Sequence, residues 1–266
     1  MNGVYTERKM ILSRFLQREV VIDIFFPGKT DIIPEEINLL LINDGQNLSE
    51  LNLASILGEL YAENFIEPLI CIGIHTGAER KMEYGVATQA DYLSRGAKAK
   101  LYTSFIIEEL MPFITTKFAD SVFKTKAFAG FSLGGLSAID IVWNHPAIFQ
   151  KAGVFSGSFW WRSVDQSSIE YDDDKHRIMH QQIRNGKYKQ GLQFFFQCGE
   201  MDEAVDRNNN GIIDSIDDTL DVIKELEKKG YERPADMYYL EIAEGKHDIA
   251  TWAIAMPSFL RWGWGK

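Results

Sequence analysis

One segment, Gly130-Phe131-Ser132-Leu133-Gly134-Gly135, constrains the fold of this chain more than any other. The short run 126–129 comes before it, and a run that is apolar nearly all round, 136–143, follows. This order predicts a buried strand, a tight Gly-x-Ser-x-Gly turn and a helix packed against a sheet. In such a turn the serine backbone is strained and its hydroxyl stands clear of the sheet. Ser132 is therefore the candidate nucleophile; a glycine-lined helix start with a capping serine is the alternative.

The rest of the chain alternates strands and helices in the manner of a parallel sheet with helices on both faces. An antiparallel strand pair at the sheet edge is expected over 10–26, and a polar loop through Arg80 and Tyr84. Strands are predicted at 37–42, 68–74, 126–129, 151–155, 192–197 and 237–242, and helices at about 49–61, 97–118, 133–144, 172–185, 216–229 and 249–261. In such sheets, reacting groups gather at the carboxyl ends of the strands.

Composition limits the class of protein. The 266 residues are 45% hydrophobic, enough for a sizeable core, and no linker or repeat divides them, so we expect one domain over 1–266. A net charge of −10 without a Lys/Arg cluster argues against nucleic acid and anionic membranes as partners. The polar start, 1–9, lacks the apolar segment of a signal peptide and no run is long enough to span a membrane, which favours the cytoplasm.

Two cysteines are present, Cys71 and Cys198, and each lies inside an apolar, strand-like run. This position predicts two buried thiols and no disulfide.

A serine nucleophile needs a histidine base, which His247 can supply from the loop directly after the last predicted strand. His75, which also follows a strand, is an alternative, and His145 at a helix end reads as structural. His176 and His180 are spaced i, i+4 beside three aspartates, a spacing that suits a metal but is expected here of a solvated helix face.

The acid that orients the base should follow the strand between the nucleophile and the histidine. The segment 198–203 offers Asp202, with Glu200 and Glu203 as close rivals, and Asp202 is our choice. For the oxyanion, we expect one donor to be the amide of Leu133 and the other the amide of Gln46, in the loop after the strand 37–42. An ordinary turn is the alternative for that loop.

Several motifs in this order resemble the Putative esterase family of α/β-hydrolases, which includes enterochelin esterases, feruloyl esterases, S-formylglutathione hydrolase and the mycolyltransferases. The resemblance covers nearly the whole chain. It rests on Leu-Leu-Ile-Asn-Asp-Gly-Gln-Asn (40–47), Arg80 with Glu83-Tyr84, Glu-Glu-Leu-Met-Pro (108–112), Gly-Phe-Ser-Leu-Gly-Gly (130–135), Phe149 with Phe-Ser-Gly-Ser-Phe-Trp-Trp (155–161), Gly-Glu-Met-Asp (199–202) and Gly-Lys-His-Asp (245–248) with Trp252.

The resemblance implies the α/β-hydrolase fold, with Ser132 as nucleophile, Asp202 as acid and His247 as base. It departs from many members, which carry His-Gly where this chain has Asp44-Gly45, and enterochelin esterases proper carry a further N-terminal domain that this sequence lacks. A trilactone siderophore substrate is therefore not implied.

Substrate contacts are expected from four further side chains near the predicted strand ends, namely Asp44, Arg80, Trp160 and Trp161. The two tryptophans would suit an acyl or aromatic pocket, and buried packing is an equal alternative for at least one of them.

A second pattern, over 206–217, matches the calcium-loop template. Its expected ligands are the side chains of Asp206, Asn208, Asn210, Asp214 and Asp217 and the carbonyl of Ile212. Position 12 of the loop is Asp, whereas many such loops have Glu there. In this respect the loop resembles those of dockerin domains. Because the loop starts shortly after Asp202, we expect a structural calcium that braces the acid; a loop that binds nothing is the alternative.

The sequence thus predicts a serine esterase that acts on a small-molecule ester through an acyl-enzyme, without an organic cofactor. Acyl transfer to a sugar or other alcohol, and a catalytically silent, calcium-braced binding module, are the alternatives. The oligomeric state is left open.

Overall fold

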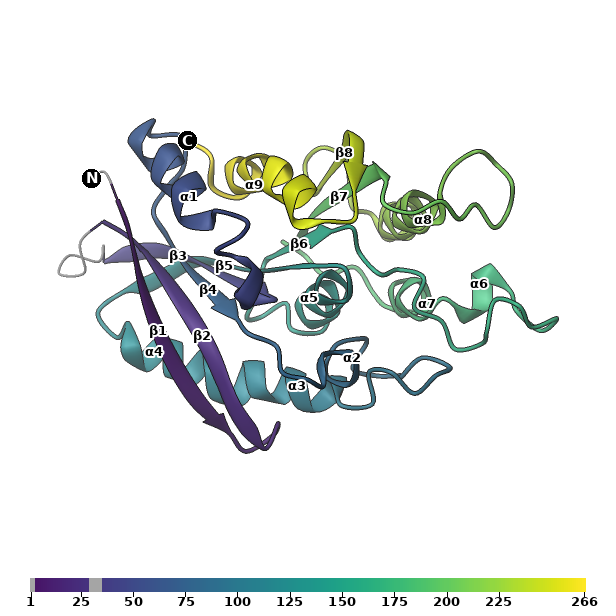
Figure 1. Ribbon diagram of the computed structural model, residues 1–266, viewed down its shortest axis with the longest axis horizontal. Coiled ribbons are helices and arrows are strands. Elements are labelled where there is room, and N and C mark those ends of the chain that lie inside the picture. Colours follow the sequence, from purple (N-terminus) through teal and green to yellow (C-terminus); the bar gives the residue numbers. More distant parts are fainter. Residues whose placement is uncertain (1–2, 29–34) are drawn as a thin grey trace.

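The computed structural model describes residues 3–28 and 35–266; Met1 and Asn2 of the polar N-terminus lie outside the described residues. The chain forms one eight-stranded sheet between two layers of helices (Figure 1). The strands are β1 (Val4–Ser13), β2 (Arg18–Pro27), β3 (Glu36–Asn43), β4 (Leu69–Ile74), β5 (Val122–Phe131), β6 (Lys151–Phe155), β7 (Gln193–Met201) and β8 (Met237–Lys246).

The sheet order is β1-β2-β4-β3-β5-β6-β7-β8. The pairs β1–β2 and β2–β4 are antiparallel, and the other five pairs are parallel. This confirms the predicted α/β-hydrolase architecture with an antiparallel N-terminal edge.

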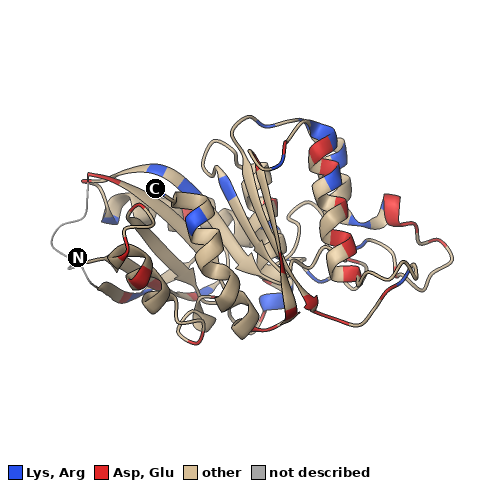
Figure 2. Ribbon diagram, turned by 90° about the horizontal axis from the view of Figure 1, so that it is seen from above, with Lys and Arg blue, Asp and Glu red and all other residues tan. Residues whose placement is uncertain are grey.

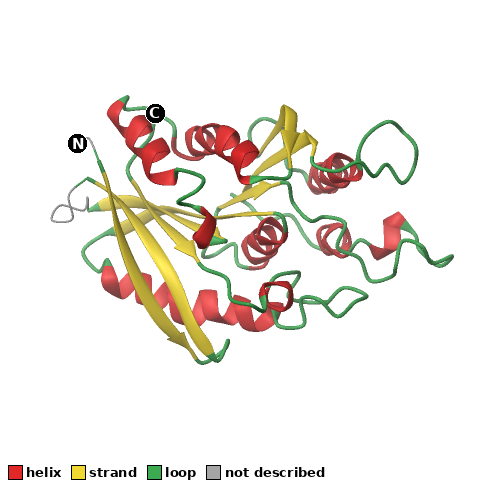
Figure 3. Ribbon diagram, in the orientation of Figure 1, coloured by secondary structure: helices red, strands yellow, loops and turns green. Residues whose placement is uncertain are grey.

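Helices cover both faces of the sheet, as Figure 3 shows in red. They are η1 (Gly45–Asn47), α1 (Leu53–Ala62), α2 (Arg80–Glu83), α3 (Ala99–Phe105), η2 (Ile106–Leu110), α4 (Met111–Lys117), α5 (Leu133–Asn144), α6 (Asp173–His176), α7 (Ile178–Asn185), α8 (Asp214–Lys229) and α9 (Ile249–Trp264). None of the helices in 3–28 and 35–266 is long and apolar enough to cross a membrane.

Two apolar cores lie on opposite faces of the sheet. The larger one packs α3, α4, α5, α7 and α8 against the sheet, and the other packs α1 and α9. The strand interiors are fully buried on both faces, as the continuous apolar runs of β3 and β4 predict. Charged residues recur along α8 (Figure 2), and Asp214, Asp217, Asp218 and Glu225 among them are buried. Cys71 and Cys198 are buried and unpaired, as predicted.

Three predicted elements were wrong in detail. β1 begins at Val4 and not near residue 10, because an edge strand tolerates the charged residues that alternate along its outer side. The expected loop through Arg80 contains the short helix α2. The helix predicted at 172–185 is broken at Arg177, whose backbone is extended (ψ 106°) and whose side chain pairs with α8.

Candidate active site

The turn between β5 and α5 holds Ser132 in a strained conformation, with φ 54° and ψ −123°. The turn needs its glycines, because a side chain at these positions would collide with neighbouring atoms. A Cβ on Gly130 would lie 2.4 Å from the backbone of Gly134, and one on Gly134 would lie 2.8 Å from the Asp44 carboxylate. The predicted strand, turn and helix are therefore confirmed, with the partly exposed Ser132 at the carboxyl end of β5.

The hydroxyl of Ser132 lies 3.2 Å from the hydroxyl of Ser158, a buried residue in the loop after β6. The Ser158 N–H also donates to the Ser132 carbonyl, at 3.3 Å. No hydrogen bond joins Ser132 to His247 among the described residues, and catalytic hydrogen bonds often tighten only when substrate binds. Sequence reasoning missed Ser158, although the Ser-Gly-Ser that follows a strand was a signal for it.

His247 directly follows β8, at the same edge of the sheet as Ser132. Its ring is exposed and its edge meets the Trp252 ring, with centroids 5.4 Å apart. Partial desolvation lowers the pKa of His247, the charge of Asp202 raises it and the charge of Arg80 lowers it. A carboxylate and a guanidinium therefore both act on this imidazole.

Asp202 is the carboxylate of its segment that faces the site. Its Oδ1 accepts a hydrogen bond from the Ser156 hydroxyl at 3.1 Å, while its Oδ2 is buried without a hydrogen-bond partner in the described part of the chain. Burial raises the pKa of Asp202. Glu200 is exposed and binds the Glu244 N–H, and Glu203 accepts a hydrogen bond from the Ser215 N–H. The geometry favours Asp202 over both rivals.

The two expected oxyanion donors each lie in the first turn of a helix. Leu133 is the first residue of α5 and Gln46 lies in η1, so neither N–H has an acceptor within its helix. The Gln46 side chain is tied to Thr76 by two hydrogen bonds, of 3.0 and 3.1 Å, which fix η1 beside the end of β4. Their role as oxyanion donors stays a prediction.

Arg80 and Asp44 form a bidentate ion pair beside the nucleophile turn, with both N···O distances 2.7 Å. Asp44 is buried at the end of β3, in a left-handed conformation (φ 60°). The Arg80 side chain is 30% exposed and also approaches the Phe131 carbonyl, at 3.4 Å. The guanidinium of Arg80 therefore stays partly exposed beside the nucleophile turn, and its charge acts on His247.

The two predicted tryptophans differ in exposure. Trp161 is fully buried and packs against Gly85 and Gly96, where an added Cβ would come within 2.8 Å of its ring. Trp160 is partly exposed and stacks under Arg95, at 4.8 Å. The expectation of substrate contact is therefore corrected for Trp161, which belongs to the core, and stays a prediction for Trp160.

The loop 206–217 turns at Gly211, which has φ 86°. The Asp206 carboxylate accepts hydrogen bonds from the N–H groups of Asn210 and Gly211, and the side-chain amides of Asn208 and Asn210 donate to Asp217 at 2.8 and 3.1 Å. Ile212 is exposed. The described residues contain no group of three or more His, Cys, Asp or Glu side chains suited to a metal ion.

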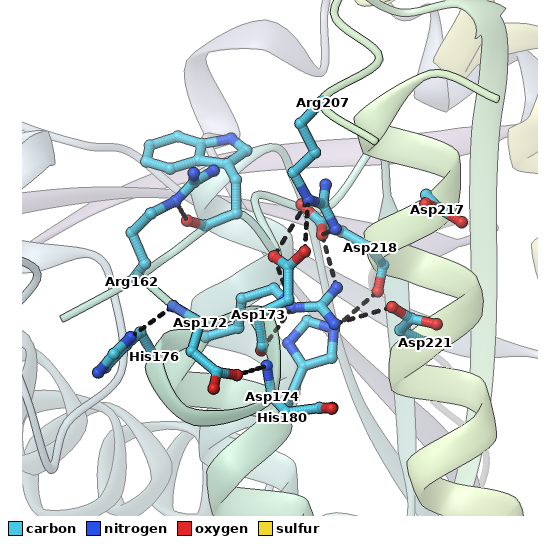
Figure 4. Close-up of polar contacts among 12 residues, drawn as sticks. Arg162, Asp172, Asp173, Asp174, His176, His180, Arg207, Asp217, Asp218 and Asp221 are labelled. Atoms are coloured by element: carbon cyan, nitrogen blue, oxygen red, sulfur yellow. Dashed lines mark hydrogen bonds and ion pairs between the residues drawn. The ribbon is translucent and has the colours of Figure 1, made fainter. Parts of the chain in front are cut away.

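A buried ion cluster holds this loop to the protein (Figure 4). Arg207, only 6% exposed, pairs with Asp173, Asp214 and Asp218 at 3.1, 3.2 and 2.8 Å. Arg177 pairs with Asp218 at 2.7 Å and with Asp221 at 2.8 Å. The carboxylate of Asp214, an expected calcium ligand, is therefore already paired with Arg207.

The other four histidines have partners or places of their own in the described structure. His75 pairs with Asp23 at 2.7 Å, and His145 is the C-cap of α5. His176 accepts the Asp172 N–H, and the buried His180 pairs with the Asp218 carbonyl at 2.9 Å. The predicted solvated helix face is wrong for His180, which is 1% exposed, and Arg177 interrupts the helix between the two histidines.

Known proteins share this fold. The chain superimposes on the enterobactin esterase FES of Shigella flexneri with a TM-score of 0.73 at 17% identity, over 97% of this chain and 58% of that chain. It also superimposes on the siderophore hydrolase EstB of Aspergillus nidulans with a TM-score of 0.69 at 17% identity, over 96% and 94%. The chain thus spans little more than half of the FES chain.

In sequence, the chain is 23% identical over 231 residues to a protein named YbbA, described as uncharacterised, from Bacillus subtilis (strain 168). This match covers 85% of the chain and 84% of YbbA. The model of the family described as Putative esterase matches residues 13–262. Since that match spans nearly the full sequence, the chain belongs to the Putative esterase family of α/β-hydrolases.

Proposed function

We propose that this protein is a serine esterase in which Ser132, His247 and Asp202 form a catalytic triad. The observation that carries the proposal is the strained Ser132 at the end of β5, with His247 and Asp202 following the nearby strands β8 and β7. The charge of Asp202 acts on the His247 ring, and the unpartnered Oδ2 of Asp202 is free to accept its N–H.

In the proposed reaction, Ser132 Oγ attacks the ester carbonyl while His247 accepts the hydroxyl proton. The C–O bond to the alcohol then breaks and His247 returns the proton to the leaving oxygen. Water repeats the sequence on the acyl-enzyme and releases the carboxylic acid. The amides of Leu133 and Gln46 would stabilise each tetrahedral oxyanion.

The substrate we propose is a small ester with an anionic or aromatic group. Arg80 keeps part of its guanidinium exposed beside Ser132 although Asp44 holds it in place, and the partly exposed Trp160 offers an aromatic face. The names of similar structures mention enterobactin and ferulic acid, so both kinds of ester belong in the first assays.

A panel of p-nitrophenyl esters, feruloyl esters and enterobactin, incubated with the wild type and with Ser132→Ala, tests the proposal. We expect hydrolysis and fluorophosphonate labelling by the wild type, and a loss of about 10³-fold or more in Ser132→Ala. Ser55→Ala, which removes an exposed hydroxyl on α1, is the matched control. A wild type that is inert and unlabelled would favour the silent binding module, and products esterified to an added alcohol would favour acyl transfer.

We also propose a structural calcium ion in the loop 206–217. Support comes from the inward-turned Asp206 carboxylate and from Asn208 and Asn210, whose amides gather on Asp217 and would present oxygen after rotation of the amide. Melting temperatures with calcium and with EGTA test this, with Asp206→Asn as the variant. Identical melting temperatures for the wild type in both conditions would contradict it.

A further inference from the structure

Ser156, the residue after β6, makes two side-chain hydrogen bonds although it is 1% exposed. Its Oγ lies 3.0 Å from the indole Nε1 of Trp252 and 3.1 Å from Oδ1 of Asp202. An indole N–H can only donate and a serine hydroxyl has one proton. The Ser156 oxygen therefore accepts from Trp252, and its proton is directed to Asp202.

Trp252 lies in the first turn of α9 and is 7% exposed. Its ring meets the edge of the His247 ring, with centroids 5.4 Å apart at 79°. Its other contact is Phe131, the residue before the nucleophile, with centroids 4.9 Å apart at 24°. One indole thus touches the base, the neighbour of the nucleophile and, through Ser156, the acid.

We propose that Trp252 and Ser156 are positioning residues that align Asp202 with His247. The inference rests on the proposed function, and it assigns a role that the triad itself does not require. Trp252 fixes the rotation of the Ser156 hydroxyl, which holds Oδ1 of Asp202 and leaves Oδ2 for the imidazole. The same indole limits the tilt of the His247 ring.

The surroundings of Asp202 explain why such a hold is needed. Burial raises the pKa of Asp202, and the hydrogen bond from Ser156 opposes that rise by favouring the charged carboxylate. The charged groups that act on His247 are Asp202, Arg80 and Asp248. Because Arg80 opposes a positive imidazolium, the alignment of Asp202 matters for proton transfer.

A double-mutant cycle with Trp252→Phe and Ser156→Ala tests the coupling. Phenylalanine keeps one aromatic ring and removes the N–H donor together with part of the indole, a loss of volume that Trp264→Phe reproduces in the control. We expect each variant to lower kcat about tenfold with little change in KM, because a loosened Asp202 should shift by less than the ~1 Å that costs roughly a hundredfold. The double variant should also lose about tenfold in kcat, and not about a hundredfold. Both changes break the same chain of hydrogen bonds, from Trp252 through Ser156 to Asp202.

Two matched controls remove the same groups where they have no partner. The indole N–H of Trp264 and the hydroxyl of Ser215 are buried without a hydrogen-bond partner in the described part of the chain. Trp264→Phe and Ser215→Ala should leave kcat within about twofold. Multiplicative losses in the cycle, or equal losses in the controls, would overturn the proposal.

A measurement that needs no substrate separates this inference from the proposed function. In the wild type, the Trp252 indole N–H should exchange with solvent more slowly than that of the partly buried Trp262, and Ser156→Ala should accelerate it. Ser132→Ala should not. Fast exchange of the Trp252 N–H in the wild type would refute the hydrogen bond from Trp252 to Ser156, even if the variants fail to fold. Slow exchange in a protein that hydrolyses no ester would refute only the proposed esterase function.

Discussion

Ser132 and Asp202 stand at the ends of β5 and β7, with only β6 between them, and yet their surroundings differ in kind. The position of Ser132 is set by backbone: a strained φ of 54°, glycines without room for a Cβ, and an N–H that donates to the Phe155 carbonyl. The ion pair of Arg80 and Asp44 lies beside this turn, and Arg80 donates to the Phe131 carbonyl at 3.4 Å.

Asp202 and the loop that follows it, here called the acid side, are instead positioned by side-chain contacts. Ser156 holds Asp202, and the loop that follows is tied down by Arg207 through three aspartates. Buried ion pairs contribute through charge and fail when one partner is lost. The comparison indicates that the nucleophile side should be sensitive to added bulk and the acid side to charge and pH.

The largest effect is expected from Asp202→Asn. An asparagine keeps the shape but cannot hold the imidazole tautomer that accepts a proton, so kcat should fall by about 10³- to 10⁴-fold. Glu200→Gln makes the same change at the exposed rival near the end of β7. It should leave kcat within about twofold. Ester-hydrolysis kinetics measure both. The reverse ranking would move the acid to Glu200.

Arg207→Met should lower the free energy of unfolding by about 3–5 kcal/mol, because it leaves buried carboxylates without their cation. Asp214 and Asp218 are 6% and 1% exposed at the side chain. Arg233→Met, which removes an exposed pair with Glu227, is the control and should cost less than about 1 kcal/mol. Urea unfolding compares them, and equal costs would show that the cluster does not brace the acid side.

Gly130→Ala should lower the free energy of unfolding by about 1–3 kcal/mol, because the new Cβ would lie 2.4 Å from the Gly134 backbone. Its ester hydrolysis should fall as well, since the nucleophile turn must open. Gly58→Ala, in α1 with no atom within 4 Å of the added Cβ, should instead gain about 0.5–1 kcal/mol. Urea unfolding of the two variants is the measurement. A harmless Gly130→Ala would contradict the account of the nucleophile side.

The pH dependence of stability separates the two sides further. Burial lowers the pKa of His180, beside Arg177, from 6.5 to about 3. Between these values the unfolded chain binds a proton that the folded protein does not, so stability falls as pH falls. At pH 5 the contribution of His180 amounts to about 2 kcal/mol.

His180→Gln should remove that part of the acid sensitivity. Glutamine can still donate to the Asp218 carbonyl but does not titrate. The difference in free energy of unfolding between pH 7 and pH 5, measured in urea for wild type and variant, gives the result. An unchanged difference would show that His180 is not the titrating group.

The sequence was most informative where backbone sets the structure. The Gly-x-Ser-x-Gly turn, the succession of strands and helices and the antiparallel edge follow from glycine spacing and apolar periodicity, which act locally. It was least informative where side chains distant in the chain meet. Nothing in the sequence ties Ser156 to Trp252, or Arg207 to Asp173, since those contacts exist only after the sheet forms.

Trp161 illustrates the same limit. A Trp-Trp pair after a strand predicts an aromatic surface, but only packing decides which ring is buried, and here Gly85 and Gly96 make room for Trp161.

Ser132 and Ser156, both with positive φ, each donate their N–H to the next strand along the sheet, at Phe155 and Gln197. These two hydrogen bonds can form only once β5, β6 and β7 lie side by side. These contacts join segments far apart in the chain, and such contacts form slowly during folding. In a refolding experiment, the return of fluorophosphonate labelling at Ser132 would then report that β5, β6 and β7 have assembled. The return of helical circular dichroism alone would not.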